Sequence, residues 1–160
     1  MKKALFLVLT LDFLALGYGI STLSISYYEA KLYFDDDSLT AFIAHLGTTL
    51  LGQNDFGLRL PFVLIHCLSA ILLYFYALKI TKTQKDALFS LVLFLLLPGT
   101  VASALCVNEA SLVICLSLLV LCAYEYGFKK CFYILLVLVL FVDSSFAVLF
   151  LSLFFYLLKK

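Results

Sequence analysis

The sequence predicts an all-α membrane protein with several transmembrane helices, and two observations carry this prediction. First, 65% of the 160 residues are hydrophobic and only 13% are charged, which gives a mean hydropathy of +1.15. A soluble domain of this size must cover itself with polar groups, so the composition excludes one. Second, the apolar residues form long runs with few charges, near the length of about 20 residues that crosses a bilayer.

Four of these runs are predicted to be full transmembrane helices: residues 4–26, 61–78, 87–107 and 112–124. The first is long enough to cross the hydrocarbon at about 1.5 Å per residue, and no small-residue cleavage site follows it, so we expect a retained helix and not a signal peptide. Pro61 is expected in the first turn of its helix, where the missing N–H is tolerated. Pro98-Gly99 is expected to kink or break the third run.

The last segment, residues 131–158, carries a pair of lysines at each end. A single crossing would place Lys159-Lys160 on the face opposite to the other lysines and Asp143 in mid-membrane, where a carboxylate is costly. We therefore predict a short hairpin that turns at residues 142–145. The whole chain, residues 1–160, is predicted to be one transmembrane domain.

The lysine clusters predict the orientation. Lys2-Lys3, Lys79/Lys82/Lys85 and Lys129-Lys130 all lie on one side of the membrane if the loop 27–60 lies on the other. By the positive-inside rule the N-terminus is then cytoplasmic and the loop 27–60 extracytoplasmic, in an inner (plasma) membrane. The lysines form small clusters between spans and no basic face, so nucleic acid is not an expected partner.

The loop 27–60 holds half of the acidic residues of the chain. Among Asp35, Asp36 and Asp37, one or two can ligate a divalent cation such as Mg²⁺ or Mn²⁺, or one can act as a general base. Alternatively, these aspartates only cap the helix that follows, since Asp37-Ser38 is good N-cap chemistry. Apolar residues at every fourth position predict that residues 38–51 form an interfacial amphipathic helix.

Four further residues complete the candidate set. Glu29 lies at the expected outer end of the first helix, and Glu109 lies at a turn on the same predicted face, so the two acidic features can converge. Glu29, Asp36 and Glu109 are the candidate metal ligands. Arg59 can bind either lipid head groups or a phosphate. Asp12 is buried in the first run and needs a partner that the sequence does not identify.

Three stretches resemble the N-terminal part of polytopic GT-C glycosyltransferases, closest to the dolichyl-phosphate-mannose protein mannosyltransferases and the aminoarabinose transferase-like enzymes. They are YYEAKLYF (27–34), LLGQNDFGLRLP (50–61) and LPGTVASALCVNEASLVI (97–114). The resemblance covers nearly the whole chain but about the first third of a typical family member. It implies transfer of a sugar from a polyprenyl-phosphate carrier to an acceptor on the outer face of the membrane.

By this resemblance, Glu29 matches the Glu of an Asp-Glu pair that serves as base or metal ligand. Glu109 matches a second acidic site, and Arg59 matches the arginine of the RLP motif, so both are expected to bind substrate. The chain departs from the family at Tyr28, which replaces the Asp of the pair, and at DDDSLTAF, which replaces a Pro-rich segment.

Three functions follow as hypotheses. The first is a membrane glycosyltransferase in which Glu29 and one of Asp35–Asp37 act as base or cation ligands. The second is a non-catalytic fragment, split subunit or assembly partner, with a second membrane subunit that supplies further helices. The third is a small transporter, based on Asp12 and Asp143 within the membrane.

Overall fold

A computed structural model describes residues 2–36, 38–140, 148 and 151–152. Within this part of the chain every regular element is a helix. In chain order the helices are α1 (Lys2–Thr22), α2 (Tyr27–Asp35), α3 (Leu39–Leu51), α4 (Asp55–Thr81), α5 (Gln84–Leu96), α6 (Pro98–Leu105), α7 (Glu109–Glu125) and α8 (Lys129–Leu140). The predicted all-α class is confirmed for these residues.

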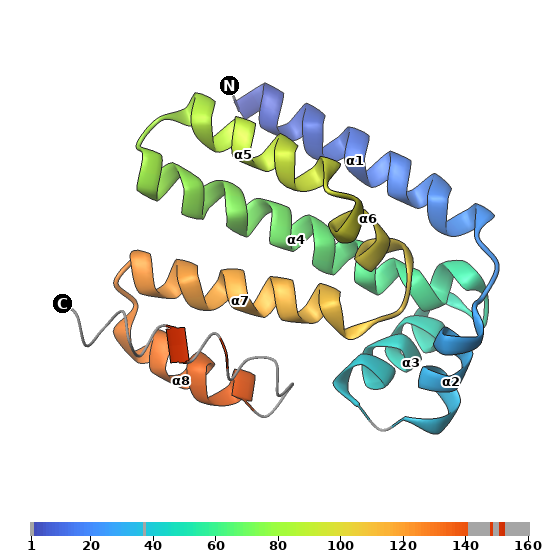
Figure 1. The fold of residues 1–160 in the computed structure, drawn as a ribbon. Helices are drawn as coiled ribbons and strands as arrows, with labels where there is room; N and C mark the ends of the chain where they lie inside the picture. The colour runs from blue at the N-terminus through green and yellow to red at the C-terminus, as the bar shows by residue number, and fades with distance from the viewer. Residues whose placement is uncertain (1, 37, 141–147, 149–150, 153–160) are drawn as a thin grey trace.

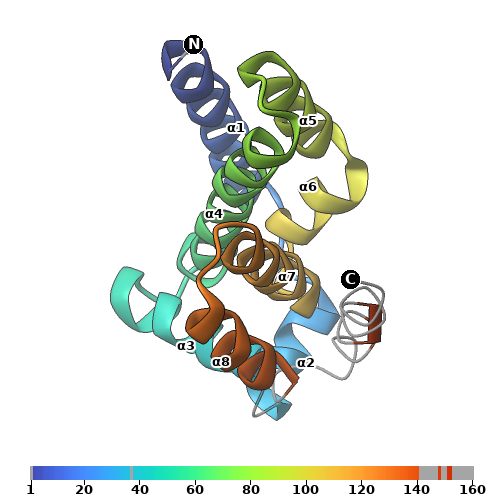
Figure 2. The ribbon, with the colours of Figure 1, turned by 90° about the vertical axis from the view of Figure 1, so that its left-hand side faces the viewer.

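The long helix α4 forms the centre of the bundle. It packs against α1, α3, α5, α6 and α7, and Figures 1 and 2 show α4 between the α1–α5 side and α7. Its buried residues Ala70, Tyr74 and Ala77 form a core with Ala87 and Leu91 of α5. Small residues on α4 let the neighbouring helices approach closely, as is usual between membrane helices.

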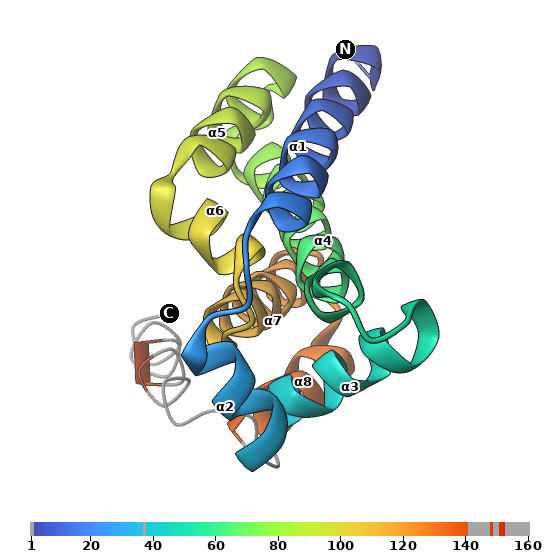
Figure 3. The same ribbon diagram turned by 90° about the vertical axis from the view of Figure 1, so that its right-hand side faces the viewer.

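The two ends of the bundle differ in composition. The short helices α2 and α3 lie at one end, beside the C-terminus of α1 and the N-terminus of α4 (Figure 3). The start of α1, the α4–α5 turn and the α7–α8 turn lie at the other end (Figure 1). The lysine clusters of the described residues belong to this second end, whereas α2 and the α3–α4 turn bring acidic residues to the first.

The structure supports fewer full membrane spans than the sequence predicted. Among the residues that the structure describes, two helices are long and apolar enough to cross a membrane, Lys3–Thr22 and Asp55–Thr81. A third candidate is α5 with α6, if this bent pair is one span. The expected break at Pro98 is confirmed, because α5 and α6 meet at an angle of 61°. The fourth expected span is α7, a helix of 17 residues, which is at the short limit for a crossing.

Two helix boundaries correct the predictions. The first helix ends at Thr22 and not at residue 26. Ser26 has an extended backbone and is the N-cap of the next helix, α2. Pro61 lies inside α4 and not in its first turn, because Asn54 caps that helix and its side chain accepts a hydrogen bond from the N–H of Gly57. Proline has no N–H, so the carbonyl of Gly57 lacks its usual helical donor. Gly47 of α3 packs closely against this carbonyl and the ring of Pro61.

The amphipathic helix expected over residues 38–51 is present as α3. Ser38 is its N-cap and accepts a hydrogen bond from the N–H of Ala41. The apolar side chains Phe42, Leu46 and Leu50 are exposed, while the small residues on the opposite face are buried against α4. This outward apolar face suits contact with lipid. At the other end of the chain, α8 covers most of the first arm of the predicted hairpin, but a single crossing would begin with the same helix. The turn at residues 142–145 lies outside the described residues, so the hairpin stays a prediction.

Candidate functional site

The candidate site begins at a capping box that fixes Glu29. The side chain of Ser26 accepts a hydrogen bond from the N–H of Glu29, and the carboxylate of Glu29 accepts one from the N–H of Ser26. This reciprocal arrangement satisfies two backbone donors at the start of α2. It also directs the Glu29 side chain back toward the end of α1, and the side chain is only 2% exposed.

Arg59 forms a bidentate ion pair with Glu29. Its Nε donates to Oε1 at 2.8 Å and its Nη2 donates to Oε2 at 2.6 Å. The same guanidinium donates to the carbonyl oxygens of Leu23 at 2.5 Å and Ser24 at 2.8 Å. The paired fork geometry is the strongest form of a carboxylate–guanidinium contact. Arg59, on the first turns of α4, therefore holds the α1–α2 connection in place.

A third segment joins this ion pair. The N–H of Val107, in the turn between α6 and α7, donates to Oε1 of Glu29 at 3.0 Å. The carboxylate thus accepts two hydrogen bonds at each oxygen, from Arg59 and Val107 at Oε1 and from Arg59 and Ser26 at Oε2. A carboxylate has about four such acceptor positions. In this structure none of them is left for a substrate proton or a metal ion.

The hydrogen bonds to Glu29 also determine its protonation. Burial alone raises its pKa, but the hydrogen bonds from Arg59 and from the backbone N–H groups of Ser26 and Val107 outweigh burial and lower the pKa from its ordinary 4.5 to about 2. Donors that bind the charged form of a carboxylate have this effect. Glu29 is therefore ionised at neutral pH and has little tendency to accept another proton.

A pocket of about 260 Å³ opens beside the ion pair, between α2 and the α3–α4 turn. Its polar lining consists of Glu29, Tyr33, Thr48, Gln53, Asn54 and Asp55. The hydroxyls of Tyr33 and Thr48 hydrogen-bond to each other at 3.0 Å, and Asn54 caps α4. The lining offers hydroxyl, amide and carboxylate groups, the donors and acceptors that a polyhydroxyl ligand such as a sugar requires.

The loop aspartates lie at the end of α2, away from the ion pair. Asp35 and Asp36 are exposed, and with Tyr28 and Lys31 they line a second depression of about 270 Å³. The carboxylate of Asp36 accepts a hydrogen bond from the N–H of Ser38, and Ser38 itself is the N-cap of α3. Asp37 lies outside the described residues.

Glu109 lies in the first turn of α7 and is exposed. The α6–α7 turn contacts Glu29 through the N–H of Val107, two residues before Glu109. Convergence of the two acidic side chains stays a prediction. Among the described residues, no group of three or more His, Cys, Asp or Glu is placed to hold a metal ion. The divalent cation therefore stays a prediction from the sequence.

Sequence reasoning considered Glu29 and Arg59 separately and missed that they bind each other. The signal that could have shown the orientation of Glu29 is the S-x-x-E spacing of Ser26 and Glu29, which is the sequence signature of a capping box. The contribution of Val107 has no sequence signal, because any residue other than proline supplies a backbone N–H. The partner of Asp12 was also missed, and it is His66 on α4, with Nε2 3.4 Å from Oδ2.

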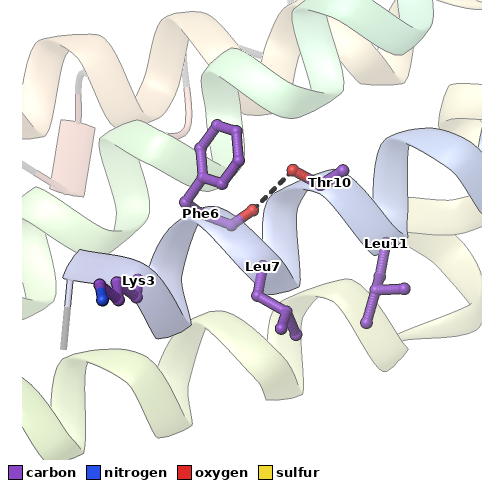
Figure 4. Close-up of a pocket in the computed structure, with 5 residues that line it drawn as sticks. All are labelled: Lys3, Phe6, Leu7, Thr10 and Leu11. Atoms are coloured by element: carbon purple, nitrogen blue, oxygen red, sulfur yellow. Dashed lines mark hydrogen bonds between the residues drawn. The ribbon is translucent and has the colours of Figure 1, made fainter.

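One further depression lies on the outer surface of α1. Figure 4 shows its five lining residues, Lys3, Phe6, Leu7, Thr10 and Leu11, all on this one helix. Thr10 donates a hydrogen bond to the carbonyl of Phe6 at 2.8 Å (Figure 4), so its hydroxyl is satisfied within the helix. The lining is almost wholly apolar and typical of a surface that faces lipid, so we do not consider it a site for chemistry.

Comparison with known proteins identifies the class. The family model for dolichyl-phosphate-mannose-protein mannosyltransferase matches residues 38–159. The chain therefore belongs to this family of membrane glycosyltransferases of the GT-C type, as its motifs had indicated. The matched segment includes Arg59 and Glu109, while Glu29, Asp35 and Asp36 precede it. Neither the curated proteins nor the solved structures gave a match.

Proposed function

We propose that this protein transfers a sugar from a polyprenyl-phosphate carrier to an acceptor on the extracytoplasmic side of an inner (plasma) membrane. The observation that carries the proposal is the family match over residues 38–159. The pocket beside Glu29, whose lining includes Glu29 and Asp55, supports it and lies at the end of the bundle opposite to the lysine clusters. With the N-terminus in the cytoplasm, this pocket faces outward and lies next to the lipid that carries the donor.

In the proposed reaction, the exposed carboxylate of Asp35 or Asp36 accepts the proton of an acceptor hydroxyl. The hydroxyl oxygen forms a bond to the anomeric carbon of the sugar while the bond from that carbon to the polyprenyl phosphate breaks. A positioned carboxylate base contributes about 10²- to 10⁴-fold to the rate of such a step.

Glu29 and Arg59 take a positioning role in this proposal. The two side chains hydrogen-bond to each other, and both residues are buried. Their pairing holds α2, and with it the aspartates at its C-terminal end, against α4 and the α6–α7 turn. Loss of the pair is expected to lower activity by displacing α2.

An assay of sugar release from dolichyl-phosphate mannose, in membranes that contain the full chain, tests the proposal. We expect the double variant Asp35→Asn/Asp36→Asn to lower the rate at least about 10²-fold. Glu125→Gln at the opposite end of the bundle is the matched control and is expected to keep the wild-type rate. Equal rates for the double variant and the wild type would exclude these aspartates as the base.

A second candidate function, an assembly partner that keeps the scaffold without the reaction, is favoured by the saturated hydrogen bonding of Glu29. If the wild-type chain releases no sugar from the donor but co-purifies in a fixed ratio with another membrane subunit, this second function replaces the first.

Labelling of a cysteine at position 36 from the extracytoplasmic side, in a variant without the native cysteines, tests the orientation separately.

A further inference from the structure

Asp12 and His66 form a second carboxylate–imidazole contact, far from the Glu29 site. Asp12 lies near the middle of α1 and His66 near the middle of α4, the two helices that are long and apolar enough to cross a membrane. At about 1.5 Å per residue, Asp12 is roughly 15 Å from each end of α1, and His66 is roughly 16 Å and 22 Å from the two ends of α4. A polar pair at this depth is placed where ionisable groups are costly and where they usually have a functional role.

The side chains of Asp12 and His66 face each other inside the helix bundle. His66 Nε2 lies 3.4 Å from Asp12 Oδ2, and neither atom has a hydrogen-bond partner. The side chain of His66 is 3% exposed and that of Asp12 is 11% exposed. The imidazole also stacks on Phe94 of α5, with ring centroids 5.5 Å apart and planes 15° from parallel. The aromatic ring covers one face of the imidazole and excludes water from it.

The surroundings hold little other charge. Residues 87–105 of α5 and α6 contain no titratable side chain. On α4, Cys67 is the titratable neighbour that interacts electrostatically with Asp12, and Lys3 of α1 lies about 13 Å away along its helix. A lone carboxylate or a lone imidazolium here would be an unpaired charge in apolar surroundings, which costs several kcal/mol. Only the state that holds one proton between the two groups has no net charge.

We propose that Asp12 and His66 form an intramembrane proton-binding site, which holds one proton on the imidazole of His66 opposite the carboxylate of Asp12 and so binds α1 to α4. Proton uptake converts a neutral imidazole and a carboxylate into an imidazolium–carboxylate pair. The proton comes from the solvent, and no oxidant or other reactant is needed.

Histidine-selective ¹⁵N labelling of the full chain in lipid bilayers tests the site, because the sequence has only His45 and His66. At neutral pH we expect the ¹⁵N signals of His66 to be those of a ring with both nitrogens protonated in the wild type. In Asp12→Asn we expect the signals of a neutral ring. The exposed His45 is the internal reference, and His45→Gln assigns the signals. An identical state of the His66 ring in the wild type and in Asp12→Asn would overturn the proposal.

A second measurement applies if Asp12→Asn does not fold. In His66→Gln the carboxylate of Asp12 loses its cation and is expected to take up a proton from water. The infrared spectrum should then gain the carbonyl stretch of a protonated carboxyl, a band that the wild type and the double variant Asp12→Asn/His66→Gln lack. Absence of this band in His66→Gln would also overturn the proposal.

Discussion

Two pairs of a carboxylate and a basic side chain lie inside the described part of the helix bundle, and they differ in how well their polar atoms are satisfied. Glu29 and Arg59, at the α2–α3 end, share two hydrogen bonds. Arg59 also donates to the carbonyls of Leu23 and Ser24, and Glu29 also accepts from the N–H groups of Ser26 and Val107. Asp12 and His66, in mid-bundle, face each other at 3.4 Å with no hydrogen bond at the facing atoms.

This difference separates a structural contact from a site that can change state. A buried ion pair stabilises a protein only when its geometry is good and its remaining polar atoms are satisfied. Glu29 and Arg59 meet that condition, and they connect α1, α2, α4 and the α6–α7 turn. Asp12 and His66 do not meet it, so their contact depends on where one proton lies.

The largest expected effect is that of Arg59→Met. This variant leaves the carboxylate of Glu29 buried without a cation and the carbonyls of Leu23 and Ser24 without a donor, which should cost about 3–5 kcal/mol of unfolding free energy. Chemical unfolding of the purified protein in detergent measures this loss. Lys85→Met, at an exposed position of the opposite end, is the matched control and should change stability by less than about 0.5 kcal/mol. A similar small loss in both variants would mean that the ion pair does not hold the helices together.

Acidification should weaken the same contact. The pKa of Glu29 is lowered from 4.5 to about 2 in the folded protein, so its contribution to stability is complete above about pH 4.5. This contribution is lost as the pH falls toward 2, and its full size is about 3 kcal/mol. Unfolding curves recorded between neutral pH and pH 3 measure the loss. Glu29→Gln should be less stable at neutral pH and lose less stability on acidification. An unchanged pH dependence in that variant would assign the effect to other carboxylates.

The crossing of α3 and α4 sets the position of the α2–α3 end, which carries the well-satisfied pair Glu29–Arg59. A Cβ atom at Gly47 would clash with the carbonyl oxygen of Gly57 and lie 2.5 Å from Cγ of Pro61. Gly47→Ala should therefore destabilise the protein by about 1–3 kcal/mol. Gly17→Ala in α1 is the matched control, because a Cβ there meets no atom within 4 Å. It should raise stability by up to about 1 kcal/mol through helix propensity, and the two thermal unfolding curves should move in opposite directions.

The sequence predicted the helices better than it predicted what joins them. The apolar runs located α1, α4 and α5, the spacing of Phe42, Leu46 and Leu50 located α3, and Pro98 located the break, because these features depend on local pattern. The start of α4 was misplaced because Pro61 was given more weight than the Asn54 cap. The site was predicted as separate residues. The pairing of Glu29 with Arg59, and of Asp12 with His66, joins positions 30 and 54 residues apart, and no spacing rule specifies such contacts.

The smallest expected effect tests the one part of the Glu29 site that the sequence does encode. Ser26→Ala removes the side chain that accepts from the N–H of Glu29, while the backbone N–H at position 26 can still donate to the carboxylate. Loss of an N-cap costs about 1 kcal/mol, less than removal of Arg59, because the ion pair still holds the carboxylate. Ser21→Ala is the matched control, since its exposed hydroxyl bonds only to the carbonyl of Tyr18 in the described contacts. If Ser26→Ala were as damaging as Arg59→Met, the capping box and not the ion pair would be what positions Glu29.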